Sequence, residues 1–173
     1  RQVVPISAEM ALGRGVSVLE GRLSDRANGR IDETFDLSGA RALPGQHNHQ
    51  NVAAAYAACH ALGVDPQEIL RAVETFPGLP HRLEAAGVVD GVAFINDSKA
   101  TNGQAAAQAI RAYQNAFWIA GGRPKDDGLD GVEELFPQIR KAFLIGEAAK
   151  EFARQLQGKV EYEVCGSLDV AVR

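Results

Sequence analysis

The stretch that decides the fold is Val92-Ala93-Phe94-Ile95-Asn96-Asp97-Ser98-Lys99-Ala100-Thr101-Asn102. Its first four residues are apolar, as in a buried strand, and the seven that follow are polar except for one alanine. An alanine-rich helix is expected to begin near Gln104. Because open α/β sheets bind ligands where their strands end, the polar segment is a candidate ligand site. The alternative is an ordinary connection, since Ser, Thr, Asp and Asn also cap helices.

Strands and helices alternate through the second half of the chain. Strands are predicted at 92–95, 117–120, 142–145 and 160–164, and helices at 103–113, 131–138 and 147–157, with another starting near Ser167. Short links between alternating elements predict a parallel sheet with right-handed crossovers. The expected fold class is therefore α/β, Rossmann-like in the broad sense, although no G-x-G-x-x-G string is present.

The first 76 residues have a different pattern. Strands are predicted at 3–6, 16–19 and 31–37, followed by a helix over 48–62. Asp65-Pro66 predicts the start of a second helix, because Asp caps well and Pro fits the first turn. Pro77-Gly78-Leu79-Pro80 ends that helix and is typical of a hinge. We therefore expect domains over 1–76 and 77–173, and, because both chain ends interrupt predicted elements, a fragment of a longer protein.

Composition excludes several classes of function. The chain is 46% hydrophobic and 23% charged, as in soluble globular proteins. A net charge of −4 leaves no basic surplus for nucleic acid. No apolar run approaches the ~18 residues of a membrane span, and no signal peptide is visible. Two distant cysteines give neither a disulfide framework nor a metal motif. We expect a cytoplasmic protein.

The segment Gly45-Gln46-His47-Asn48-His49-Gln50-Asn51 places two asparagines three residues apart at a predicted helix start. Such residues share one helix face. A carboxamide offers a donor beside an acceptor, which matches the N6 and N7 edge of adenine. The alternative is that Asn48 caps the helix and Asn51 is a surface residue. His47 and His49 lack a neighbouring carboxylate or cysteine, which favours solvated or capping histidines over metal ligands.

Two further segments carry candidate ligand-binding cations. Leu79-Pro80-His81-Arg82-Leu83-Glu84 places Arg82 directly after the hinge, and guanidinium suits phosphate or ribose hydroxyls. A surface pair of Arg82 with Glu84 is the alternative. Ala120-Gly121-Gly122-Arg123-Pro124-Lys125 follows a predicted strand, so the glycines allow close approach of the backbone to a ligand, and Lys125 can meet a carboxylate. A plain glycine-rich turn is the alternative.

In chain order the four segments read G-x-H-N-x-x-N-x-x-A-A, L-P-H-R-x-E, N-D-S-K-A-T-N and G-G-x-x-K. This order resembles the Mur ligases of peptidoglycan synthesis over essentially the whole chain, least over residues 1–40. The D-S-K-A-T-N string is similar to that of members that add D-glutamate. The resemblance implies the end of a P-loop-type ATPase domain, over 1–76, followed by a Rossmann-like, mostly parallel sheet domain truncated at its C-terminus, over 77–173.

The resemblance also implies the chemistry. ATP would phosphorylate the carboxylate of UDP-N-acetylmuramoyl-L-alanine, and the amine of D-glutamate would then displace phosphate, with Mg²⁺ neutralising charge. The implied ATP-binding residues are Asn48, Asn51, Arg82, Asp97 and Lys99, the last two also catalytic. The implied D-glutamate-binding residues are Ser98, Thr101 and Lys125, although Arg123-Pro124 departs from the family's loop. The whole protein would be a monomer serving cell-wall synthesis, cell shape and cell division.

The sequence also departs from the family. It contains no P-loop string of the form G-x-x-G-K-[ST], and the family's Mg²⁺ ligands and UDP-sugar domain have no counterpart. We therefore expect no metal ligands in this chain and no turnover by the 173 residues alone. The alternatives are a sibling Mur ligase or a folylpolyglutamate synthase-type ligase, against which D-S-K-A-T-N argues, and a non-catalytic binding domain.

Overall fold

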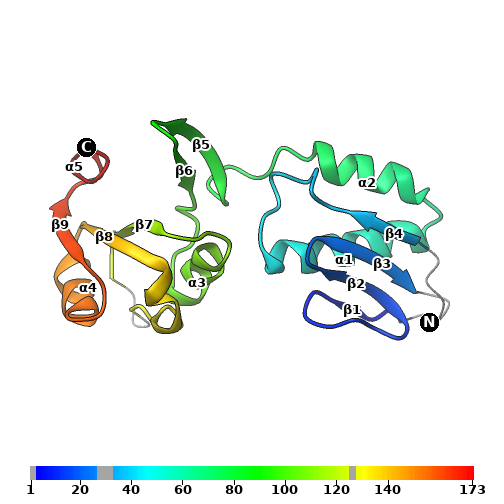
Figure 1. Ribbon diagram of the computed structural model, residues 1–173, viewed down its shortest axis with the longest axis horizontal. Coiled ribbons are helices and arrows are strands. Elements are labelled where there is room, and N and C mark those ends of the chain that lie inside the picture. The colour runs from blue at the N-terminus through cyan, green and yellow to red at the C-terminus, as the bar shows by residue number, and fades with distance from the viewer. Residues whose placement is uncertain (1–2, 27–32, 125–127) are drawn as a thin grey trace. The chain divides into compact units, whose positions relative to one another are not determined.

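A computed structural model describes residues 3–26, 33–124 and 128–173, which form two compact units, 1–96 and 97–173 (Figure 1). Unit 1 contains β1 (Ile6–Ser7), β2 (Gly15–Leu19), β3 (Arg22–Arg26), β4 (Glu33–Asp36), α1 (Gln46–Ala61), α2 (Pro66–Thr75), β5 (Glu84–Val89) and β6 (Val92–Asn96). Unit 2 contains α3 (Gly103–Arg111), β7 (Ala116–Gly121), the 3₁₀-helix η1 (Glu133–Gln138), β8 (Ile139–Ile145), α4 (Ala149–Leu156), β9 (Tyr162–Gly166) and α5 (Leu168–Ala171). The α/β class is confirmed; the domain boundary after residue 76 stays a prediction.

Unit 1 is built on a four-stranded sheet in the order β1-β2-β3-β4. The β1–β2 pair is parallel and the other two pairs are antiparallel. Helix α1 lies against β1 and β2, and α2 lies against α1. The core between sheet and helices includes Val16, Val18, Leu23, Val52 and Tyr56, each at most 3% exposed. This packing fixes the first turn of α1 relative to the sheet.

Both helices of unit 1 confirm the prediction from sequence. Asp65 caps α2, because its carboxylate accepts the N–H groups of Gln67 and Glu68 at 2.9 and 3.3 Å. Strand β1 begins only at Ile6, later than predicted. The predicted strand at 31–37 is β4, and its first two residues lie outside the described ranges.

Strand β3 was missed by the sequence analysis because one of its inward positions holds a charged residue. Leu23 and Asp25 both face inward, and Asp25 is only 2% exposed. The imidazole Nδ1 of His60 lies 3.1 Å from the Asp25 carboxylate and 3.2 Å from the Tyr56 hydroxyl. A buried carboxylate needs such partners, and it removes the apolar alternation that marks a strand.

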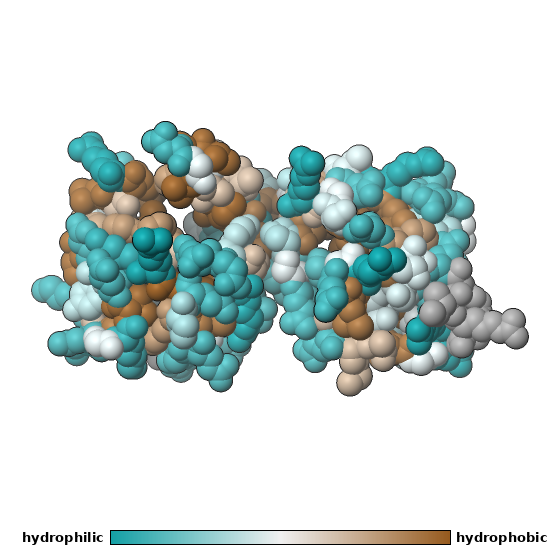
Figure 2. Space-filling model, in the orientation of Figure 1, coloured by the Kyte–Doolittle hydropathy of each residue, from teal (hydrophilic) through white to brown (hydrophobic). Residues whose placement is uncertain are grey.

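The hairpin β5–β6 corrects the interpretation of residues 92–95 as a buried strand of a parallel sheet. Strand β6 pairs antiparallel with β5 in a two-stranded sheet of their own. Val88, Val89, Val92 and Phe94 are between 36% and 70% exposed, and Figure 2 shows apolar residues on the surface there. The strands are joined by Asp90-Gly91, both with positive φ (50° and 81°), a pair that favours tight hairpins.

Unit 2 contains the predicted parallel sheet, with strand order β7-β8-β9 and both pairs parallel. One apolar core gathers residues from the sheet, α3, η1 and α4, and it includes Ile110, Leu135, Ala142, Leu144 and Leu156. The predicted helix at 131–138 is the 3₁₀-helix η1, with Pro137 inside it. No helix in the described ranges combines the length and the apolar character needed to cross a membrane.

Gly103 opens α3 against a neighbouring backbone. A Cβ at this position would contact the carbonyl oxygen of Asp130 and would lie 2.8 Å from the nitrogen of Asp130 and 2.9 Å from the carbonyl carbon of Leu129. Only glycine therefore permits the start of α3 to pack this closely on residues 129–130. This contact fixes the helix start that follows the polar segment 97–102.

We predict that Leu144→Ala destabilises unit 2 by about 2–5 kcal/mol, because the side chain is fully buried in the central strand and its loss leaves a cavity. The sequence has a single tryptophan, Trp118 in β7, whose fluorescence in urea reports this unit. Val164→Ala in β9, where the side chain is 55% exposed, is the control and should cost below about 1 kcal/mol. Equal losses would contradict the assigned core.

We predict that Gly103→Ala lowers the free energy of unfolding by about 1–3 kcal/mol, because the added methyl group forces the backbones of α3 and residues 129–130 apart. This effect should outweigh the better helix propensity of alanine, about 1 kcal/mol. Circular dichroism in a urea titration measures the change. Gly13→Ala is the control, since a Cβ there meets nothing within 4 Å. A Gly103→Ala variant as stable as the parent would disprove the tight contact.

Candidate functional site

The first two turns of α1 carry both predicted asparagines. The helix starts after Gly45, with a φ of 87°, whose carbonyl accepts the backbone N–H groups of Asn48 and His49 at 3.1 Å. The Nδ2 of half-buried Asn48 donates to the Pro44 carbonyl at 2.8 Å, and Asn51 is exposed one turn later. The alternative that Asn48 caps the helix is therefore wrong, because Gly45 occupies the capping position.

Two glutamines tie the start of α1 to the loop after β1. The Nε2 of Gln46 donates to the Ala8 carbonyl at 2.9 Å, and Gln50 Oε1 accepts the Ala8 N–H at 2.8 Å. Beside them lies a pocket of about 710 Å³, lined by Ala8, Glu9, Val18, Leu19, Glu20, Gln46 and His49. Burial, with a smaller contribution from His47, lowers the pKa of His49, which favours its neutral form. The asparagine face is thus held on a rigid helix start.

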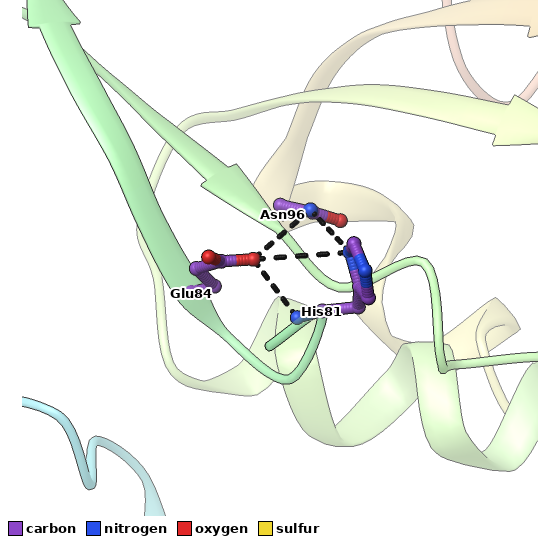
Figure 3. A network of polar contacts seen from close by, with 3 residues as sticks. All are labelled: His81, Glu84 and Asn96. Carbon is purple, nitrogen blue, oxygen red and sulfur yellow. Dashed lines mark hydrogen bonds and ion pairs between the residues drawn. The ribbon is translucent and has the colours of Figure 1, made fainter. Parts of the chain in front are cut away.

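Arg82 lies in the turn before β5. Glu84 follows it closely in the chain but contacts residues other than Arg82. The carboxylate Oε2 of Glu84 accepts the His81 backbone N–H at 2.9 Å and the Asn96 Nδ2 at 3.2 Å (Figure 3). Within the described chain, Glu84 is thus paired with His81 and Asn96, so the alternative of an Arg82–Glu84 pair is wrong. The guanidinium is exposed, in a position to meet a ligand.

The polar segment after β6 forms a short exposed loop. The Ala100 N–H donates to the Asp97 carbonyl at 2.8 Å, which closes a turn, and Ser98, Lys99 and Thr101 are exposed. Asn102 caps α3, with its side chain accepting the Ala105 N–H at 2.8 Å. The capping alternative is therefore correct for Asn102.

Asp97 is half-buried and electrostatically coupled to Tyr113. Burial, and secondly the charge of Asp97, raise the pKa of the Tyr113 phenol. The phenol accordingly stays protonated at neutral pH. The loop thus offers one carboxylate, one ammonium and two hydroxyl groups within five residues, a set able to bind a charged ligand on several sides.

The glycine pair at the C-terminal end of β7 packs closely on the neighbouring backbone. A Cβ on Gly121 would contact the Ile145 carbonyl oxygen, and Gly122 donates its N–H to that oxygen at 3.1 Å. The carbonyl of Gly122 accepts the Ala148 N–H at 3.0 Å. Close packing of β7 on Ile145 thus explains Gly121, and the role of this turn in ligand binding stays a prediction. Lys125, predicted to hold a carboxylate, lies outside the described residues.

The structure therefore places Asn48, Asn51 and Arg82 in unit 1, and Asp97, Ser98, Lys99 and Thr101 on one loop of unit 2. The sequence did not predict the contacts of Glu84 and Asn96, although both residues lie in the motifs quoted above. These contacts depend on the conformation of the turn before β5, which residue spacing does not determine. The described residues contain no cluster of three or more His, Cys, Asp or Glu side chains able to hold a metal ion.

Comparison with known proteins agrees with the motifs. No family model matches the sequence. The UDP-N-acetylmuramoylalanine–D-glutamate ligase of Phenylobacterium zucineum is 51% identical over the whole chain, and that of Caulobacter vibrioides is 50% identical over the whole chain. The corresponding ligase of Rhodospirillum rubrum is 48% identical over 99% of the chain. The chain spans only 36–37% of the length of these relatives.

The fold agrees with the same family. The crystal structure of MurC, a UDP-N-acetylmuramate-alanine ligase from Thermotoga maritima, matches 86% of this chain and 39% of its own, with a TM-score of 0.61 and 17% identity. MurF from Acinetobacter baumannii matches 85% of this chain and 34% of its own, with a TM-score of 0.55 and 22% identity. Along its whole length the chain thus corresponds in sequence to part of a D-glutamate-adding ligase, and the resemblance to the Mur ligases is confirmed.

Proposed function

We propose that the chain carries part of the ATP site and the D-glutamate site of an ATP-dependent ligase acting on UDP-N-acetylmuramoyl-L-alanine. The observation that carries the proposal is the similarity of the whole chain, at 51% identity, to ligases named for D-glutamate addition. The exposed loop with Lys99 and Thr101 supplies polar groups that such a reaction needs. The whole enzyme would be a cytoplasmic monomer, and its product would serve the cell wall, cell shape and cell division.

The side chains of unit 1 suit a nucleotide. Carboxamides of Asn48 and Asn51 match the hydrogen-bonding edge of adenine, and the exposed Arg82 guanidinium suits ribose hydroxyls or phosphate. Anchoring by the two glutamines reduces the freedom that the α1 start would lose on binding. In this proposal the Asp97 carboxylate accepts hydrogen bonds beside the nucleotide, because an ionised carboxylate is purely an acceptor.

The loop of unit 2 suits the two chemical steps. In the first, a substrate carboxylate oxygen attacks the γ-phosphorus of ATP, the bond to ADP breaks, and Lys99 offsets the negative charge that develops. In the second, the unprotonated amine of D-glutamate attacks the acyl carbon, the tetrahedral centre loses a proton to solvent, and phosphate leaves. Ser98 and Thr101 hydroxyls, with Lys125, would hold the carboxylates of D-glutamate in position.

Magnesium belongs to this proposal as a charge-neutralising ion for phosphoryl transfer. Such a site needs several oxygen ligands, and the described residues lack a cluster that could supply them. We therefore assign no Mg²⁺ ligand to these residues and propose that the Mg²⁺ ligands lie in other parts of the enzyme. The binding and positioning roles above are carried by this chain's own side chains.

We predict that Lys99→Ala in the full-length ligase lowers kcat by about 100-fold or more, because it removes a charge aimed at the transferring phosphoryl group. The rate of phosphate release with saturating ATP and D-glutamate measures it. Lys150→Ala is the matched control: it removes an exposed lysine from α4 in the same unit and should leave kcat unchanged. Similar rates for both variants would reject the role of Lys99.

We predict that Thr101→Ala raises the KM for D-glutamate about tenfold or more, since a hydrogen bond to a charged carboxylate is lost. The KM for ATP should change by less than about threefold, because the hydroxyl is not assigned to the nucleotide. Steady-state kinetics on the full-length ligase separates the two constants. A rise in the KM for ATP alone would contradict the assignment of Thr101 to the D-glutamate site.

We predict that the 173-residue chain by itself releases no phosphate from ATP in the presence of both co-substrates, because it contains no P-loop string. Phosphate release above the rate without enzyme would contradict this.

Among the alternatives, a ligase of the folylpolyglutamate synthase type would prefer another amino acid over D-glutamate. A non-catalytic domain would leave full-length protein inactive with every amino acid tested.

A further inference from the structure

The turn before β5 holds its residues in an unfavourable backbone conformation. The Arg82 N–H donates to the Leu79 carbonyl at 3.1 Å and closes a four-residue turn, with Pro80 second and His81 third. His81 has a φ of 64°, and Leu83 has a φ of 46°. Such turns prefer glycine or asparagine at the third position, because the side chains of other residues crowd the backbone in the left-handed conformation. Arg82 is therefore flanked by two strained residues.

One carboxylate compensates this strain. Glu84 Oε2 accepts the backbone N–H of His81 at 2.9 Å, which is the amide of the strained residue itself. The same oxygen accepts Asn96 Nδ2 at 3.2 Å, across the β5–β6 pair in which Glu84 faces Asn96. The side chain of Asn96 also meets His81 Nδ1 at 2.9 Å (Figure 3). Glu84 thus joins the Arg82 turn to the last residue of β6.

The contacts determine which ring nitrogen carries the hydrogen in the neutral form of His81. An ionised carboxylate only accepts, so Asn96 must present its NH₂ group to Glu84. An NH₂ group only donates, so the nearby His81 Nδ1 must be the acceptor and carry no hydrogen. The proton of the neutral ring therefore lies on Nε2. The network is satisfied by one tautomer and one amide orientation.

Asn96 directly precedes Asp97 in the loop assigned to catalysis. Holding Asn96 therefore holds the point from which that loop departs, while holding His81 orients the exposed Arg82 that follows it. We propose that Glu84 is a positioning residue, whose carboxylate fixes the Arg82 turn against Asn96, the last residue of β6. The hydrogen bonds of Glu84 and Asn96 do not depend on any assigned activity, whereas the consequence for ATP rests on the proposed function.

The first test measures the network in the 173-residue chain. Nitrogen-15 NMR of the imidazole at alkaline pH, where an imidazole is neutral, should show the Nε2–H tautomer of His81 in the parent. Glu84→Ala should remove the acceptor that orients the Asn96 amide and give a mixture of tautomers, whereas Glu84→Gln, whose carbonyl oxygen still accepts both hydrogens, should keep the parent pattern. Glu134→Ala, an exposed glutamate in η1, is the control. A His81 signal that Glu84→Ala leaves unchanged would refute the network.

The second test measures its consequence in the full-length ligase. Glu84→Ala should raise the KM for ATP about tenfold while kcat falls less than about threefold, and Glu84→Gln should stay within about threefold of the parent in both. Glu134→Ala should match the parent. Equal defects in both Glu84 variants, or an unchanged KM in Glu84→Ala, would overturn the positioning role. A parent ligase without ATP-dependent activity would refute the proposed function and its ATP consequence, whereas the NMR result decides the network separately.

Discussion

Burial of one sheet face under helices is the constraint on which each unit depends. In unit 1, α1 covers β1 and β2, and its Tyr56 is completely buried against the sheet. In unit 2, the parallel strands place Ala142 and Leu144 in one core with residues of α3 and α4. Parallel strands restrict where the connecting helices can lie, because each crossover must return over a face of the sheet. The helix starts are therefore fixed by the cores and become reliable places for ligand-binding side chains.

The candidate site residues occur where chain geometry is most constrained. Asn48 and Asn51 lie on a helix start tied by two glutamines to the loop after β1. The 97–102 loop is held at one end by Asn96, through Glu84, and at the other by Asn102 and Gly103. Between these fixed points Ser98, Lys99 and Thr101 are exposed. A loop fixed at both ends loses less conformational entropy when it binds a charged substrate.

Much of the fold could be predicted from local sequence, and the failures have physical causes. Helical spacing and the Asp65-Pro66 cap gave α2 correctly, and apolar runs located β7, β8 and β9. The run 92–95 was placed in the wrong sheet because a short apolar strand looks the same in a hairpin as in a buried sheet. Asp90-Gly91 was the signal that could have corrected this placement. Strand β3 was not predicted because its buried Asp25 is paired with His60, 35 residues later in the chain, and no local pattern reveals this pairing.

The candidate site was predictable in composition and unpredictable in contacts. The order of the four motifs indicated a resemblance to the Mur ligases, and a ligase named for D-glutamate addition is 51% identical to the chain over its whole length. The role of Glu84 depends on a turn with two left-handed residues and on pairing across the hairpin, neither of which residue spacing encodes. The glycine motif shows a further limit of residue spacing: the structure gives Gly121 a packing contact with the Ile145 carbonyl, while the approach of a ligand to this turn stays a prediction.

The central claim is that the loop with Lys99 serves a ligase that activates a carboxylate with ATP. Oxygen-18 placed in the carboxylate of UDP-N-acetylmuramoyl-L-alanine tests it most directly, using the full-length enzyme with D-glutamate. Attack of that carboxylate on ATP and later loss of phosphate transfers one labelled oxygen to the released phosphate. We predict this transfer in the parent and in Lys150→Ala, and its loss in Lys99→Ala. Unlabelled phosphate from the parent, or undiminished transfer in Lys99→Ala, would contradict the account.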